Sequence, residues 1–248
     1  MIIHRLPWAG IMVEADGHKL LIDPLYYYNE AFFGKAHESF VPLGRLGTVD
    51  AVLVTHTHSD HFDHRAIAAF WGKDVPVYVP LEALPTAKEQ SQLPRLIGAA
   101  LHQTFTVGPF AITATHSVDG LGDPQVAWVV QGNGKTMIHC GDTLWHGYWW
   151  QIAKAFGPFD AACLPINGAV IADPDLTPSG QPICLTPEQA VSAAAVLGAQ
   201  RLIPIHFGAF HAPPQYMETP DALGRLEEGA RLRGITPVVL KPFESLTL

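Results

Sequence analysis

Short apolar runs bounded by glycine, proline and other turn residues recur along the chain and predict a protein rich in strands. Residues 51–54 are wholly apolar, which is typical of a strand that is buried on both faces. The same pattern recurs at residues 75–79, 161–166 and 201–205. Residues 1–23 predict two or three further short strands, with a tight turn at Asp16-Gly17.

Two longer segments combine apolar runs with a central turn and predict β-hairpins. The segment 126–139 has its turn at Asn133-Gly134, and Asn-Gly between apolar runs is the strongest short-range hairpin signal. The segment 101–115 has its turn at residues 108–109, which are glycine and proline. Both hairpins lead directly into residues that carry candidate chemistry.

One helix is predicted together with both of its ends. Thr186 is a typical N-cap, Pro187 suits the first helical position, and Gln189 completes a capping box. The helix should run to Leu197, because Gly198 is typical of the residue that ends a helix.

The remaining segments predict one more helix, one strand and two loops. The last helix should open at residues 219–220 and end near Gly234, and a final strand should follow at residues 238–240. Residues 24–47 carry many aromatic side chains without a clear period and predict a long loop or lid. Residues 172–185, rich in Pro, Asp and Gly, predict a second long loop, and such loops often border functional sites.

The alternation of buried strands and amphipathic helices predicts an α/β or α+β domain built in layers. The chain has 248 residues, of which 48% are apolar, so it can bury a substantial core. Only 15% are charged, while 22 glycines and 21 prolines indicate many tight connections between strands. Because the sequence contains no linker, low-complexity tract or repeat, we expect a single domain over residues 1–248.

Charge, cysteine content and hydropathy exclude several classes of protein. A formal net charge of −8 argues against nucleic acid as a partner, because contact with phosphates requires a basic stripe. The 3 cysteines are too few for a disulfide framework. No signal-peptide pattern and no apolar stretch long enough for a membrane span is present. We expect a cytoplasmic protein without an integral membrane segment, and its oligomeric state stays open.

Histidine and aspartate gather directly after the apolar run at residues 51–54. His56, His58, Asp60 and His61 place three imidazoles and one carboxylate within six residues. Imidazole nitrogen and carboxylate oxygen are the ligands that suit zinc and other divalent ions. Alternate residues of an extended segment point to the same side, so His56 and His58 should face one ion, with Asp60 and His61 near a second. A single buried histidine is usually structural. Four ligand-type side chains this close together are better explained by metal binding.

The spacing His-x-His-x-Asp-His resembles the signature of the metallo-β-lactamase superfamily. His116, Asp142 and His206 match the later positions that complete the metal site in that family. The resemblance covers essentially the whole chain and implies an α+β fold of four αββα layers, in which helices flank two mixed β-sheets. It also implies the ligands: His56, His58 and His116 for a first metal, Asp60, His61 and His206 for a second, and Asp142 as the bridge.

The resemblance implies a dinuclear metal-dependent hydrolase that acts on a small molecule. Metal-bound water would lose a proton near neutral pH, and the hydroxide would attack an ester, lactone or phosphodiester. Asp60 and Asp142 are the candidate catalytic residues, and Asp60 is also a candidate acceptor for a proton of this water. Residual positive charge on the two ions would favour an anionic substrate.

The sequence leaves the metal, the branch and the chemistry open. Histidine-rich ligation favours two zinc ions, although manganese or iron would also suit the site. The segments 141–143, 156–160, 164–168 and 206–208 resemble most the branch that contains L-ascorbate-6-phosphate lactonase and the N-acylphosphatidylethanolamine-hydrolysing phospholipase D. The alternatives are an iron-dependent redox enzyme on the same scaffold and a non-catalytic metal-binding module.

Several aromatic residues near the expected site are candidates for substrate contact. The sequence does not decide whether Trp145, Trp149, Trp150, His146 or His211 has this role. The tryptophans and residues 26–33 together could wall an apolar cleft, but packing in the core would explain them equally well.

Overall fold

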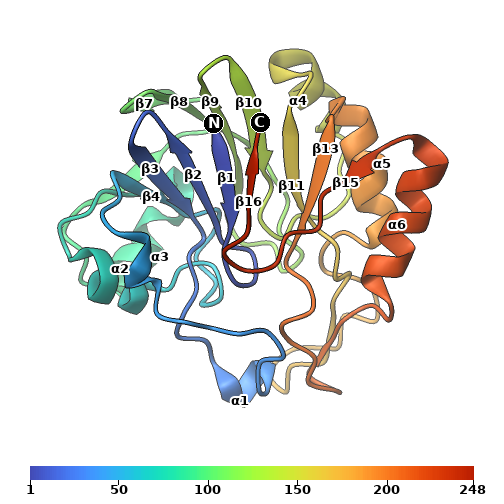
Figure 1. Ribbon diagram of the computed structural model, residues 1–248. Coiled ribbons are helices and arrows are strands. Elements are labelled where there is room, and N and C mark those ends of the chain that lie inside the picture. Colours follow the sequence, from blue (N-terminus) through green and yellow to red (C-terminus); the bar gives the residue numbers. More distant parts are fainter.

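Sixteen strands form two seven-stranded sheets and one two-stranded ribbon in the computed structural model, which describes residues 1–248 (Figure 1). The first sheet has the order β16-β1-β2-β3-β4-β5-β6. Its strands are β1 (Ile2–Arg5), β2 (Ile11–Ala15), β3 (His18–Ile22), β4 (Ala51–Leu53), β5 (Val77–Pro80), β6 (Leu96–Ala99) and β16 (Ser245–Thr247). Strands β3 to β6 are parallel, whereas β16, β1, β2 and β3 pair antiparallel, so the sheet is mixed.

The second sheet has the order β15-β13-β11-β10-β9-β8-β7. Its strands are β7 (Thr104–Val107), β8 (Phe110–His116), β9 (Val126–Gly132), β10 (Lys135–His139), β11 (Ala161–Pro165), β13 (Arg201–Ile205) and β15 (Thr236–Pro237). Strands β10, β11, β13 and β15 are parallel and the others antiparallel. The ribbon joins β12 (Val170–Ile171) to β14 (Tyr216–Met217).

Helices cover the outer face of each sheet, as Figure 1 shows for α2 and α3 on one side and α5 and α6 on the other. The helices are α1 (Glu30–Phe33), α2 (His64–Trp71), α3 (Leu84–Gln90), α4 (Trp149–Phe156), α5 (Pro187–Leu197) and α6 (Ala222–Arg233), with short 3-10 turns at Leu43–Leu46 and Leu81–Ala83. The predicted four-layer αββα architecture is therefore confirmed. No helix is long and apolar enough to cross a membrane.

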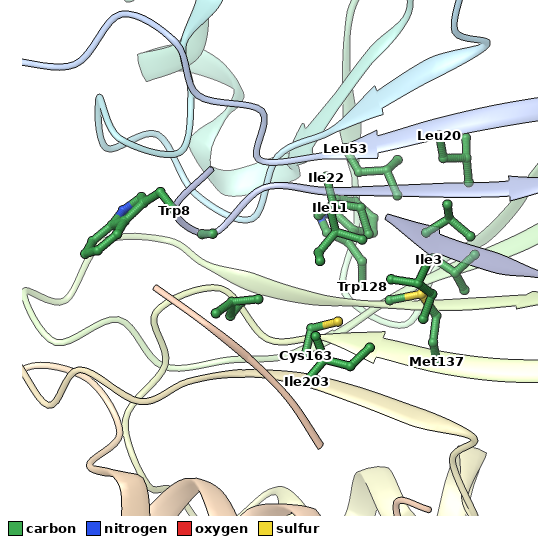
Figure 2. Close-up of a cluster of buried hydrophobic side chains, with 14 of the residues drawn as sticks. Ile3, Trp8, Ile11, Leu20, Ile22, Leu53, Trp128, Met137, Cys163 and Ile203 are labelled. Atoms are coloured by element: carbon green, nitrogen blue, oxygen red, sulfur yellow. The ribbon is translucent and has the colours of Figure 1, made fainter. Parts of the chain in front are cut away.

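Three apolar clusters separate the four layers. The central cluster lies between the sheets and takes side chains from both, among them Leu53 of β4 and Trp128 of β9 (Figure 2). A second cluster joins the second sheet to α4, α5 and α6, and a third joins the first sheet to α2 and α3. In β4, Ala51 and Leu53 belong to the central cluster while Val52 faces the helices. This explains why residues 51–54 are apolar without alternation.

Most predicted elements have the expected type and boundaries. The turns at residues 16–17 and 133–134 each have two successive residues at positive φ, as the Asp-Gly and Asn-Gly signals require. Helix α5 has the predicted capping box, and Gly198 ends it in the left-handed conformation. Residues 24–47 are mainly loop, interrupted by α1 and one 3-10 turn.

The C-terminal segment departs from the prediction. Helix α6 starts at Ala222 rather than next to Pro220. The strand predicted at residues 238–240 is wrong, because pairing occurs before it in β15 and after it in β16. Val238 and Leu240 pack against the central core while the chain crosses from the second sheet to the first. Their apolar character therefore comes from covering the core and not from a strand.

Candidate metal centre

Loops at one end of the two sheets carry the candidate site residues. Residues 55–61 follow β4, Asp142 follows β10 and His206 follows β13. Because β8, β10 and β13 run in the same direction, their carboxyl ends meet at one edge of the second sheet. The loop from the first sheet reaches this edge, where the amide of Val126 donates to the carbonyl of Thr55 at 3.0 Å.

Gly141 allows the end of β10 to approach the loop after β4. It adopts φ +64°, and a Cβ at this position would lie 2.8 Å from Thr55 Oγ1 and 2.9 Å from Gln125 Oε1. Any larger residue would therefore be both strained and crowded. The close approach brings Asp142 Oδ1 to 3.6 Å from His56 Nε2.

A first group of ligand-type atoms comes from His56, His58, Asp119 and Asp142. One atom from each residue lies within 4.8 Å of all the others. His56 Nε2 and His58 Nδ1 are 2.9 Å apart, and Asp119 Oδ1 lies 3.8 Å from His58 Nδ1. Two imidazoles and two carboxylates thus converge on one point.

A second group comes from Asp60, His61 and His206. Asp60 Oδ2 lies 3.5 Å from His61 Nε2 and 3.4 Å from His206 Nε2. The imidazole rings of His61 and His206 are stacked with their centroids 5.0 Å apart, and all three residues are buried. The two groups are adjacent, since the rings of His56 and His61 are only 4.1 Å apart.

Several of these buried atoms have no hydrogen-bond partner in the protein. They include His61 Nε2, His206 Nε2 and Asp142 Oδ1. A buried polar atom without a partner costs about 1–3 kcal/mol, and proteins rarely leave several together. Bound cations would satisfy imidazole nitrogens and carboxylate oxygens at once. The residues present therefore fit metal ions.

Asp23 holds the second group from behind. This buried carboxylate accepts hydrogen bonds from the Thr55 amide at 2.8 Å and from Thr55 Oγ1 at 2.6 Å. Asp23 Oδ2 also lies 2.9 Å from His61 Nδ1. A carboxylate in this position fixes the tautomer in which Nδ1 carries the proton and leaves Nε2 free to bind a cation.

Trp8 supports the same group from the loop after β1. Its Nε1 donates to Asp60 Oδ2 at 3.0 Å, and its ring centroid lies 4.0 Å from that of His206. The Trp8 amide donates to Glu38 Oε2 at 2.8 Å, and Glu38 forms an ion pair with the buried Arg5. Figure 2 shows Trp8 apart from the other labelled core side chains. Its indole therefore serves the site as well as the core.

Burial and mutual charge shift the pKa values of the second group strongly. Burial alone would lower the pKa of His61, but the carboxylates of Asp60 and Asp23 outweigh it and raise that pKa to about 10. Burial opposes ionisation of Asp60 too, yet His61 and His206 hold its pKa well below the usual value. Burial lowers the pKa of His206 to about 4. Without a cation, Asp60 and His61 thus form a buried ion pair.

The first group contains a neutral histidine and a carboxyl that resists ionisation. Burial, together with the neighbouring His61, holds the pKa of His56 well below 6.5, so its ring stays in the neutral form that binds metals. Burial raises the pKa of Asp142 to about 7. A cation beside Asp142 would favour the ionised carboxylate and release a proton.

Six of the seven predicted ligands fall in these two groups, and His116 does not. Its ring lies parallel to that of Tyr148, with the centroids 3.8 Å apart and an angle of 7° between the planes. The other neighbour is His102, at 4.9 Å. His116 ends β8, and the chain needs three more residues to turn back to the site, where Asp119 comes next to His58.

Asp119 lies in the first group, although the sequence analysis did not single it out. Asp119 Oδ2 accepts hydrogen bonds from the amides of Leu121 at 2.7 Å and Asp123 at 3.0 Å, so the loop itself orients the carboxylate. The sequence signal was only an aspartate beside a glycine, Asp119-Gly120. In the structure Asp119 is buried, and a Cβ on Gly120 would lie 2.0 Å from the carbonyl oxygen of Ile183. A histidine at the end of a predicted strand was the more prominent candidate.

A cavity of about 300 Å³ opens onto both groups, and we call it the site cavity. His58, Asp60, Asp142 and His206 form its polar floor. Only some of the aromatic and histidine residues that were candidates for substrate contact line this cavity. Phe32 and Phe33 line the site cavity, whereas Trp145, Trp149, Trp150, His146 and His211 do not. His146 stacks on the buried Trp149 with ring centroids 4.2 Å apart.

Sequence comparison assigns the family. The profile of the Beta-lactamase superfamily domain matches residues 7–207. The chain therefore belongs to the metallo-β-lactamase superfamily, and it is an enzyme. A UPF0173 metal-dependent hydrolase of Caldivirga maquilingensis is 28% identical over 249 residues, covering 98% of this chain and 97% of the relative.

Solved structures show the same fold. A metallo hydrolase from the archaeon Ignicoccus hospitalis superposes with a TM-score of 0.75 at 21% identity, covering 100% of this chain and 97% of the other. CmlA, a diiron beta-hydroxylase from Streptomyces venezuelae, superposes with a TM-score of 0.76 at 16% identity, covering 100% of this chain and 54% of CmlA. At these identities the likeness concerns the fold alone.

Proposed function

We propose that this metal-dependent hydrolase holds two divalent ions and cleaves an ester or lactone of a small molecule. The observation that carries the proposal is the convergence of buried, unpartnered His and Asp atoms on the floor of a cavity. His56, His58, Asp119 and Asp142 would hold the first ion, and Asp60, His61 and His206 the second. When bound, the ions supply a nucleophile derived from water near neutral pH and stabilise negative charge on the substrate oxygen.

Asp60 and Asp142 have different proposed roles. Trp8 engages Asp60 Oδ2, which leaves Oδ1 to accept a proton from the attacking water. His61 and His206 hold the pKa of Asp60 well below its usual value against the effect of burial, which keeps the carboxylate in the ionised form that binds a cation. Asp142 belongs to the first group, with Oδ1 3.6 Å from His56 Nε2, and would be a ligand there.

The ligand atoms of the first group favour zinc less than the sequence suggested. With Asp119 in place of His116, the first group has two imidazoles and two carboxylates. Carboxylates suit Mn²⁺, mixed imidazole and carboxylate ligands suit Fe²⁺, and Zn²⁺ accepts both kinds of ligand. We propose that the first position takes Mn²⁺ or Fe²⁺ as readily as Zn²⁺.

Metal removal and reconstitution test the proposal. Treatment with a chelator should abolish hydrolysis of neutral nitrophenyl esters and lactones, and two equivalents of divalent metal should restore it. Thermal unfolding should shift upward on reconstitution, because a ligand that binds only the folded state stabilises it. Elemental analysis showing no metal in the active protein, or full turnover after chelation, would exclude the mechanism.

The carboxylate content of the first group also supports a second candidate, an iron-dependent redox enzyme. Oxygen uptake separates the two functions. The hydrolase proposal expects turnover without oxygen and with zinc or manganese alone. Consumption of oxygen by the iron-loaded protein, together with no hydrolysis, would favour the redox function.

A further inference from the structure

The site cavity has a polar floor and an apolar wall built from three separate segments. Phe32 and Phe33 come from α1, Ile171 and Tyr216 from the two strands of the ribbon, and Ile183 from the loop between β12 and α5. The ring centroids of Phe33 and Tyr216 are 5.3 Å apart, and both residues are buried. Their packing holds α1 against the ribbon and makes the wall a fixed surface.

The polar atom of Tyr216 does not add a free polar group to this wall. Its hydroxyl oxygen accepts a hydrogen bond from Asn167 Nδ2 at 2.6 Å, and Cys184 Sγ donates to Asn167 Oδ1 at 2.7 Å. The ring of Tyr216 is thus the part that contributes to the cavity lining. A ligand that reaches the wall would bury apolar surface, worth about 25 cal/mol per Å².

The cavity offers no cationic side chain to a phosphate or another permanent anion, and its other polar lining residues are the uncharged Asn29, Thr57, Ser59 and Gln90. No lysine or arginine lines it, and the charged groups among its lining residues are the carboxylates of Asp60 and Asp142 and the histidines His58 and His206. Proteins bind phosphates and carboxylates through arginine, lysine or helix N-termini. Asp119 adds a third carboxylate to the metal groups, so three carboxylates and one hydroxide would cancel the charge of two divalent ions.

We infer that the substrate is an uncharged ester or lactone with an apolar alkyl or aryl group, which lies against Phe32, Phe33, Ile183 and Tyr216. This inference rests on the proposed hydrolase function. It differs from the anionic substrate expected from the sequence, because the candidate ligands considered there included the carboxylates of Asp60 and Asp142 but not that of Asp119. The volume of about 300 Å³ lies at the lower end for small-molecule sites and indicates a small substrate.

Matched substrates test the charge and the apolar group separately. With the metal-loaded protein, kcat/KM for para-nitrophenyl hexanoate should exceed that for the acetate by roughly 10-fold or more, since each extra methylene gains affinity in an apolar pocket. The butyrate should be preferred over the hemisuccinate, which has the same length and one added carboxylate. Faster turnover of the hemisuccinate, or of bis-para-nitrophenyl phosphate, would overturn the inference and leave the hydrolase function standing.

Two variants locate the specificity in the wall. Phe32→Ala and Ile183→Ala should lower the hexanoate-to-acetate ratio of kcat/KM by roughly 10-fold, because the longer acyl chain depends more on the wall. Phe70→Ala, on α2 outside the cavity, is the matched control and should leave the hexanoate-to-acetate ratio of kcat/KM unchanged. Equal losses on both esters, with unchanged thermal stability, would contradict the role of the wall.

A lysine introduced at the edge of the site cavity tests whether charge there governs the choice between charged and uncharged substrates. Leu121 lines the cavity and is 47% exposed, so Leu121→Lys should fold normally and raise the hemisuccinate-to-butyrate ratio by several-fold at low salt. Leu232, on α6 and 70% exposed, gives the control Leu232→Lys, which should leave the ratio unchanged. If both variants gave the same ratio as the unchanged chain, charge at the cavity would not govern specificity.

Binding measurements cover the case in which no ester is hydrolysed. By calorimetry, hexylboronic acid should bind the metal-loaded protein more tightly than methylboronic acid and more tightly than inorganic phosphate. Tighter phosphate binding would overturn the inference without reference to activity. A protein that binds two metals and the hexyl compound but hydrolyses nothing would refute the hydrolase function and retain an apolar, uncharged ligand.

Discussion

The two ligand groups differ in how firmly the protein holds them. In the second group Asp60, His61 and His206 are all buried, and each has a buried partner. Asp23 pairs with His61, while Trp8 donates to Asp60 and packs against the ring of His206. These supports come from the ends of β3 and β1, which belong to the first sheet.

The first group is partly exposed at His58 and depends in part on the loop of residues 117–125, although His56, Asp119 and Asp142 are buried. The side chain of His58 is 25% exposed, and its Nε2 lies 2.8 Å from Asp123, whose side chain is 52% exposed. Asp119 is oriented by amides of its own loop. The difference indicates that the second position is organised before metal binds, while the first is completed by residues 117–125. We therefore expect the second position to bind its metal more tightly.

The largest effect should come from removing Asp60, which is both a ligand and the proposed base. Asp60→Ala should lower kcat/KM by about a thousand-fold or more, the scale on which activated nucleophiles contribute. Elemental analysis should show that one of two metals is lost. Asp74→Ala removes an exposed carboxylate and is the control. Full turnover and full metal content in Asp60→Ala would show that this carboxylate has neither role.

The second largest effect should distinguish Asp119 from His116. Asp119→Ala should lose the metal of the first position, and the content should fall to about one ion per chain, because a metal site depends on its full ligand set. His116→Ala should keep both ions, since its ring stacks on Tyr148 outside the groups. The reverse result, with metal lost only from His116→Ala, would mean that the loop rearranges on metal binding.

Asp119 and His116 also show which part of the candidate site could be predicted from the sequence. The cluster at residues 56–61 was predictable because its ligands are close in the chain and follow a buried strand. Asp142 and His206 were singled out because they match later positions of the superfamily pattern, and the structure places both in the two groups. Asp119 stands three residues beyond β8, as Asp142 stands three beyond β10, but the pattern pointed to His116 at the strand end, and only the course of the loop places Asp119 beside His58.

The predicted fold was likewise accurate where the signal was local in the sequence. Elements with local signals, such as the capped helix α5 and the hairpin at residues 133–134, were predicted with nearly correct ends. Short edge elements were not, because two or three residues carry no period. The strand β16 pairs with β1 from the opposite end of the chain, and its existence depends on that partner. Asp23 and Trp8 likewise gain their roles from contacts distant in sequence.

An intermediate effect should come from replacing Asp23, the buried carboxylate that contacts His61 of the second group. Asp23→Asn keeps the shape but cannot hold His61 Nδ1 with a full negative charge, so metal affinity should fall by roughly 10- to 100-fold. A competition titration with a metal-binding dye measures this change. The metal of the first position should be affected less. An equal loss at both positions would indicate that Asp23 serves the fold in general, which thermal unfolding of the metal-free protein would reveal.

The smallest effect should come from Asp123, which faces His58 much as Asp23 faces His61. The two contacts have nearly equal lengths, 2.8 Å and 2.9 Å, but Asp123 is half exposed and Asp23 is buried. Because solvent screens exposed pairs, which contribute about 0–1 kcal/mol, Asp123→Asn should weaken the first position by no more than about 5-fold. The loss should also shrink as salt rises, whereas that of Asp23→Asn should not. If Asp123→Asn weakened metal binding as much as Asp23→Asn at high salt, the loop would be as firmly organised as the sheet, and burial would not explain the difference between the two groups.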